Sequence, residues 1–73
     1  MRVTIFIKIH GEINSRELYE LLAPYGMNVT DCGEMTLIYG EAKQADIGQI
    51  VFKAALFGDI SAEITHDRST SDS

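Results

Sequence analysis

The chain has 73 residues, 45% of them hydrophobic, and its 11 acidic and 6 basic side chains give a formal net charge of −5. This length suits one small domain, and the apolar content argues against a disordered chain. No stretch is apolar over the ~20 residues of a membrane span, and the N-terminus lacks the pattern of a signal peptide. We therefore expect a cytoplasmic protein that makes no contact with a membrane.

The charge balance also bears on nucleic-acid binding. Proteins that bind RNA or DNA usually present a basic surface, because contacts to phosphate supply much of their affinity. A nucleic-acid-binding sheet is therefore a disfavoured alternative for this acidic chain. Its few basic residues are scattered, at Arg2, Lys8, Arg16, Lys43, Lys53 and Arg68.

The first half of the chain predicts a strand, a helix and a second strand. Residues 2–10 alternate between apolar and polar side chains, which is the period of a strand with one buried face. Asn14 followed by Glu17 is typical of a helix start in which the Asn side chain caps the helix. Pro24 should end this helix, because it lacks an amide hydrogen, and a short strand over residues 27–32 follows.

The second half predicts two more strands around a second helix. A tight turn at Cys32-Gly33 should join the second strand to the third, forming a hairpin. The polar residues 67–73 are predicted to be disordered, outside a single domain of residues 1–66. The third strand, second helix and fourth strand are predicted over residues 35–39, 44–57 and 59–65.

A short stretch occurs twice, as Ile9-His10-Gly11-Glu12-Ile13 and as Ile38-Tyr39-Gly40-Glu41-Ala42. Each copy follows a predicted strand and precedes a predicted helix. We expect two equivalent turns, in which Gly supplies conformational freedom and Glu complements the helix dipole. A phosphate-binding role is disfavoured, because the carboxylate would repel an anion.

The predicted order of elements is βαββαβ, which belongs to the α+β class. Right-handed crossovers favour a four-stranded antiparallel sheet of order 4-1-3-2, with both helices on one face and the other face open. This arrangement resembles the ferredoxin-like fold over residues 2–66. It places the two Gly-Glu turns at opposite ends of the domain.

Three groups of chemical interest fall near one end of the open face: His10, Asp59 and Cys32. A metal site needs three or four converging ligands, and only the His10–Asp59 pair is expected to be close, so we predict no metal and no cofactor. Acidic neighbours, Asp31 and Glu34, disfavour a thiolate at Cys32. No other pair has the spacing for acid–base or nucleophilic chemistry, so we expect no catalytic residues and favour a non-enzymatic role.

The strand that ends at Gly11, the helix after it, and Tyr25-Gly26-Met27-Asn28-Val29 leading into the second strand resemble the small regulatory ACT domain. In that family the loop between the first strand and first helix binds an amino acid at a dimer interface. The resemblance therefore implies a small-molecule sensor as an alternative function. The implied ligand-binding residues are His10, Gly11, Glu12 and Asp59.

Apolar residues left over after the core is filled favour an interaction or regulatory module. We expect a homodimer, or a small subunit that binds a partner protein, through either of two surfaces. One is the open sheet face with Phe6 and Ile38, and the other is the second helix with Phe52 and Leu56. An alternative register of the third strand would replace Ile38 on the open face by Met35, Leu37 and Tyr39.

Overall fold

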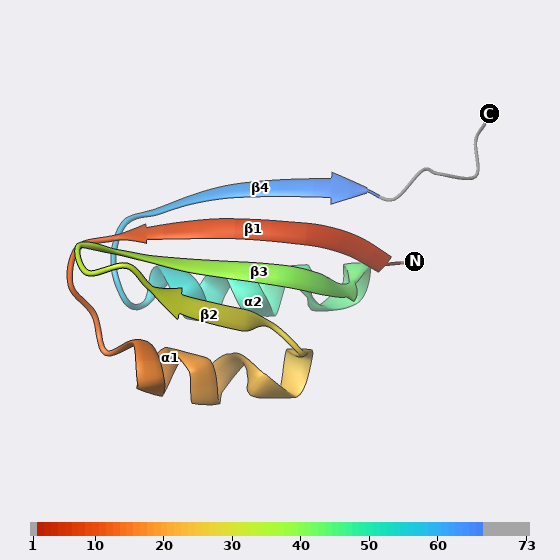
Figure 1. Ribbon diagram of the computed structural model, residues 1–73. Helices are drawn as coiled ribbons and strands as arrows, with labels where there is room; N and C mark the ends of the chain where they lie inside the picture. Colours follow the sequence, from red (N-terminus) through yellow and green to blue (C-terminus); the bar gives the residue numbers. More distant parts are fainter. Residues whose placement is uncertain (1, 67–73) are drawn as a thin grey trace.

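The computed structural model describes residues 2–66 (Figure 1). The predicted disordered tail, residues 67–73, lies outside the described residues, as does Met1. The elements, in chain order, are β1 (Arg2–His10), α1 (Ser15–Leu22), η1 (Ala23–Tyr25), β2 (Asn28–Asp31), β3 (Met35–Lys43), η2 (Gln44–Asp46), α2 (Ile47–Ala55) and β4 (Ile60–His66), where η denotes a 3₁₀ turn.

The strands form one antiparallel sheet in the order β2-β3-β1-β4. This confirms the predicted α+β class and the order 4-1-3-2, which is the same arrangement written in reverse. Both helices cover one face of the sheet and leave the other open (Figure 1). The two long central strands, β1 and β3, therefore decide which side chains face the helices and which face outwards.

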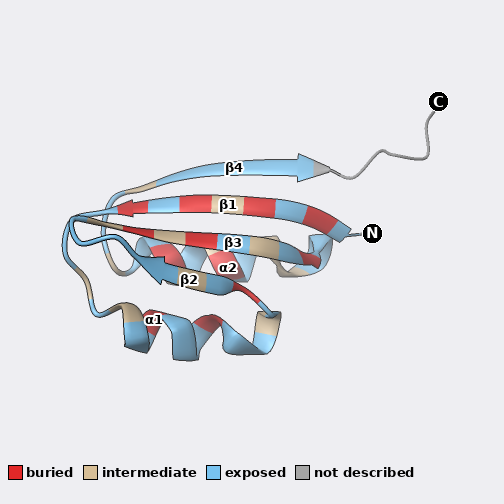
Figure 2. Cartoon of the chain, viewed as in Figure 1, coloured by how far each residue is buried: buried red, intermediate tan, exposed pale blue. Residues whose placement is uncertain are grey.

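The core lies between the sheet and the helices. β1 contributes every second residue to it, as the alternation predicted, and Figure 2 shows the resulting buried stripes along the strand. Each helix adds one apolar stripe at helical spacing. The buried apolar residues are Val3, Ile5, Ile7, Ile9, Leu18, Leu22, Met27, Ile38, Ala42, Ile50 and Ala54.

The start of α1 follows the predicted capping pattern. The side-chain oxygen of Asn14 accepts a hydrogen bond from the amide of Glu17 at 3.1 Å, which satisfies one of the unpaired amides of the first turn. The helix ends at Leu22, and the chain continues through the 3₁₀ turn that contains Pro24. Gly26, with φ 77°, then reverses the chain towards β2.

Replacing Asn14 with alanine should destabilise the domain by about 1 kcal/mol, because the Glu17 amide loses its acceptor. Urea denaturation followed by circular dichroism would measure this change. Asn14→Asp keeps an acceptor at the same position and should change stability by only a few tenths of a kcal/mol. Equal losses in both variants would contradict a capping role.

β3 is longer than predicted and contains the second Gly-Glu stretch. Gly40 pairs with Ile5 and Glu41 pairs with Thr4, so both lie inside the strand rather than in a turn. The prediction of two equivalent turns is therefore wrong. The nine-residue β1 offers backbone partners to all nine residues of β3, and this pairing draws the second stretch into the sheet. Only Gly11, with φ 98°, lies in a loop as expected.

The register of β3 also differs from the preferred prediction. Ile38 lies opposite Ile7 and is 0% exposed, so it belongs to the core face and offers no surface to a partner. The alternative register is the observed one, with Met35, Leu37 and Tyr39 on the open face. The hairpin turn sets this outcome, because a shift of one residue moves every side chain of a strand to the other face.

Candidate functional site

The end of the sheet that carries the predicted ligand site is held together by backbone hydrogen bonds. The amide of His10 donates to the carbonyl of Asp59 at 2.9 Å, and the amide of Gly11 donates to the carbonyl of Glu34 at 2.7 Å. The loop after β1, the β2–β3 turn and the start of β4 therefore meet, as the predicted topology required. Cys32 closes the hairpin through its amide, which donates to the carbonyl of Met35 at 2.8 Å.

The side chains at this end do not form a connected site. His10, Glu12 and Asp59 are exposed, and within residues 2–66 no hydrogen bond or ion pair joins their side chains. The Gly11 amide is already bonded, so it is not open to a ligand in this structure. The ligand-binding role of these residues stays a prediction. Over the described residues, no group of three or more His, Cys, Asp or Glu side chains is placed to hold a metal ion.

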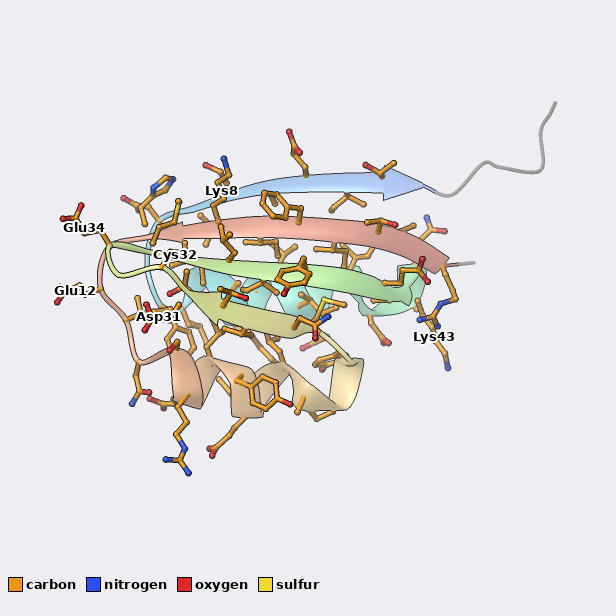
Figure 3. The ribbon with its side chains drawn as sticks, in the orientation of Figure 1. Lys8, Glu12, Asp31, Cys32, Glu34 and Lys43 are labelled. Carbon is orange, nitrogen blue, oxygen red and sulfur yellow. The ribbon has the colours of Figure 1, made fainter. Side chains whose placement is uncertain are left out.

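Acidic side chains gather at the same end, where Figure 3 shows Glu12, Asp31 and Glu34 near the β2–β3 turn and far from Lys43. Asp31 has a structural role that the sequence pattern did not predict. One of its carboxylate oxygens accepts from the Gly33 amide at 2.8 Å and the other accepts from the Ser15 hydroxyl at 3.2 Å. It therefore links the hairpin turn to the first turn of α1.

The open sheet face is of mixed character. Phe6 and Tyr39 lie opposite each other on the central strands, with the Lys8 ammonium 5.9 Å from the centroid of the Phe6 ring. The Tyr39 hydroxyl lies 3.3 Å from the Thr30 hydroxyl, which fixes its outer end. Phe6 is only half-buried, and charged side chains flank this pair, so the face is not a continuous apolar surface.

The outer side of α2 is more apolar than the open face of the sheet. Phe52 and Leu56 are 62% and 66% exposed, the highest values among the large hydrophobic side chains. Ile50 and Ala54 are buried and mark the inner side of the helix. At 100° per residue, Phe52 falls almost opposite these two, and helix α1 does not cover it.

The two flanks of α2 face different neighbours. Helix α1 contacts α2, and the half-buried Lys53 and Phe57 lie on one flank of α2. Gly48 and Ala55 lie on the opposite flank and are exposed. The connection from β3 through α2 to β4 is right-handed, which turns the flank with Lys53 towards α1 and the flank with Gly48 and Ala55 towards the outer side of β4, which α2 also contacts (Figure 1).

Strand β4 is incompletely covered by α2. Ile64 and Ala62 face the helices, yet Ile64 is 38% exposed and Ala62 is also exposed. Ile5, the partner of Ile64 on β1, is fully buried, and Figure 2 shows the contrast between these two neighbouring strands. The helical layer therefore ends before the edge of the sheet. We name the resulting apolar surface the β4 flank; it consists of Gly48, Ala55, Ala62 and Ile64 at the uncovered edge and of Phe52 and Leu56, which extend it over the outer side of α2.

The sequence pattern identified only part of this surface. Phe52 and Leu56 were predicted to be available because they lie off the core stripe of the helix. Ala62 and Ile64 were missed, because alternation in a strand marks them as core. The signal that could have found them is the predicted order of strands, which makes β4 an edge strand and leaves one of its sides without a neighbour.

Comparisons with known proteins add no assignment: no protein-family model, no curated protein and no solved structure matches the chain. Within residues 2–66, neither helix has the length and apolar character needed to cross a membrane. The function must therefore be argued from the surface itself. The feature that stands out is the β4 flank, in which exposed aromatic and aliphatic side chains adjoin the free edge of an outer strand.

Proposed function

We propose that this protein is a non-enzymatic interaction module that self-associates as a homodimer through the β4 flank. The order of its elements and strands resembles the ferredoxin-like fold, in which one sheet face and the sheet edges remain free for contact. The observation that supports the proposal is the exposure of Phe52 and Leu56 next to the uncovered residues of β4. Burial of one such side chain contributes about 1.5–3 kcal/mol, which favours association.

A second copy of the chain is a suitable occupant of this surface for electrostatic reasons. Each copy carries a net charge of −5, so two copies repel each other unless they meet where acidic side chains are absent. The β4 flank contains no charged residue. By contrast, the end of the sheet with Glu12, Asp31 and Glu34 is acidic. In a two-fold dimer the same flank is used twice, so apolar side chains face apolar side chains.

Sedimentation velocity over a range of concentrations should show a dimer of the wild-type chain at high micromolar concentration. Phe52→Ser should weaken this dimer by about 2 kcal/mol, or about 30-fold in Kd, as expected for a central aromatic residue of an interface. The fold should be unaffected, because Phe52 contributes little to the core.

Tyr19→Ser is the matched control. Tyr19 is also an exposed aromatic residue, 50% exposed, but it lies on α1 and outside the β4 flank. Its replacement should leave the dimer unchanged. A wild-type chain that stays monomeric at every concentration, or equal weakening by both substitutions, would contradict self-association through this surface.

A further inference from the structure

The free backbone groups of β4 can be assigned from its pairing with β1. The His10 amide bonds to the Asp59 carbonyl, so Asp59 directs its backbone groups towards β1. Successive residues of a strand alternate in this direction, so Ser61 and Glu63 also bond to β1. Ile60, Ala62 and Ile64 therefore direct their amides and carbonyls away from the sheet, where no described residue pairs with them.

The two edges of the sheet differ in protection. The other edge strand, β2, has only four residues, and where β3 extends beyond it, the Glu41 carbonyl accepts a hydrogen bond from the Arg2 guanidinium at 3.3 Å. Strand β4 has seven residues and carries neither Pro nor Lys, the residues that commonly block edge pairing. It is the longer and less protected edge.

We propose that two copies pair through β4, antiparallel, with Ala62 of one copy opposite Ala62 of the other, so that the two sheets become one continuous sheet. This inference rests on the proposed self-association and specifies its geometry. Residues with outward backbone groups must pair with one another, which permits registers centred on a residue, such as Ser61, Ala62, Glu63 or Ile64, and excludes registers centred between two residues. The register centred on Glu63 places two carboxylates opposite each other, which is destabilising.

Among the remaining registers, the one centred on Ala62 buries the exposed apolar residues best. It places Ile64 of each copy opposite Ile60 of the other on the helix side of the sheet, and Ser61 opposite Glu63 on the open side. The register centred on Ser61 pairs only residues 60–62 of each copy, and the register centred on Ile64 pairs residues 62–66 and leaves Ile60 without a partner. Beneath the joined strands, the α2 flanks of the two copies meet, and the small residues Gly48 and Ala55 allow the helices to approach closely.

Charge complementarity supports the same register. A hollow of about 190 Å³ lies on the open side at this edge, lined by Phe6, Lys8, His10, Ser61, Ala62 and Glu63. Lys8 lies directly opposite Ser61, and Figure 3 shows its side chain projecting from the open face of the sheet. Within residues 2–66, neither Lys8 nor Glu63 forms an ion pair.

In the Ala62 register, Glu63 of the second copy lies just beyond Ser61, two strand spacings from Lys8. This distance is about 10 Å between Cα atoms, which the two side chains together can span across the small Ser61. The carboxylate of the second copy thus enters the hollow beside Lys8. Two-fold symmetry forms this contact twice.

A proline substitution tests the edge pairing. Ala62→Pro removes an outward amide and no bond to β1, and proline is tolerated on an edge strand when its missing amide faces solvent. Sedimentation velocity should show at least a tenfold increase in the dimer Kd, with the circular dichroism spectrum retained. Val29→Pro is the matched control, because Val29 likewise directs its backbone away from β3 on the other edge, and the dimer should persist.

A cysteine substitution tests the register without disturbing the strand. In a Cys32→Ser background, Ala62→Cys should give a disulfide-linked dimer on mild oxidation, because opposed residues lie ~5.5 Å apart between Cα atoms. Ile60→Cys should not crosslink, since four residues of offset separate its two copies by ~14 Å. Crosslinking at position 60 but not at 62 would overturn the register.

The outcomes separate this inference from the self-association on which it rests. A wild-type chain that stays monomeric at every concentration would contradict both the self-association and the edge pairing. The dimer could be weakened by Phe52→Ser, yet withstand Ala62→Pro and fail to crosslink at position 62. This result would support contact through the β4 flank and would overturn the edge pairing. A dimer that is lost in both Phe52→Ser and Ala62→Pro and that crosslinks only at position 62 supports the joined sheet.

Discussion

Ile38→Ala should lower the free energy of unfolding by about 3 kcal/mol, within the 2–5 kcal/mol typical for truncating a buried aliphatic side chain. Ile38 is fully buried on a central strand, opposite Ile7, so its removal leaves a cavity that the sheet cannot close. For a domain of this size, whose total stability is on the order of 4–11 kcal/mol, such a loss is severe. Urea denaturation at fixed protein concentration would measure it.

The neighbouring residue supplies the control. Leu37 lies on the open face and is only half-buried, so Leu37→Ala should cost about 1 kcal/mol. If the Ile38→Ala variant does not fold, Ile38→Val removes a single methyl group and should cost about 0.5–1.5 kcal/mol, which still permits the comparison. A larger loss for Leu37→Ala than for Ile38→Ala would show that the observed register of β3 is wrong.

Gly40→Val should destabilise the domain by roughly 2–4 kcal/mol, although valine normally favours strands. A Cβ atom at position 40 would lie 3.0 Å from the Met27 methyl carbon and 3.4 Å from the Gly26 carbonyl oxygen. The backbone φ of 150° adds strain, because side-chain-bearing residues rarely adopt it. Chemical denaturation of the variant and the wild type under identical conditions would show the loss.

Gly11→Ala separates the steric contact from the backbone strain. Gly11 also has a positive φ, 98°, but a Cβ atom there would meet nothing within 4 Å. This substitution should therefore cost only the backbone term, about 1–2 kcal/mol. If the Gly40→Val variant were as stable as the wild type or more stable, this would contradict the close approach of Met27 to β3.

Ile38 and Gly40 are two positions at which prediction from the sequence was wrong. Alternation along residues 2–10 predicted the buried face of β1 correctly, because the period of two is strong over nine residues and no turn interrupts it. The same reasoning assigned Ile38 to the wrong face. In a shorter run, where both faces carry apolar side chains, periodicity does not distinguish the two registers.

The Gly-Glu stretch around Gly40 illustrates a second limit. Identical residue pairs suggested identical turns, yet Gly11 lies in a loop and Gly40 lies within β3. The glycine at position 40 serves a close packing contact rather than a chain reversal. Local sequence similarity could not reveal this, because the deciding partner, Met27, comes from a different part of the chain.

The candidate surface was also only partly predictable. The helical spacing of Phe52 and Leu56 marked them as residues outside the core stripe, and their exposure confirms this. The contribution of Ile64 depends on how far the helical layer extends across the sheet. That extent is set by the packing of α2 against β1 and β4, which no local pattern describes.

The sequence by itself determined the βαββαβ order, the cap at Asn14, the buried face of β1 and the α+β class, because each depends on residues that are close along the chain. Only the tertiary structure decided the register of β3, the inclusion of Gly40 in a strand, and the exposure of β4 beyond α2. These features depend on pairing and coverage between distant segments, where a shift of one residue or one strand width changes which side chains reach solvent.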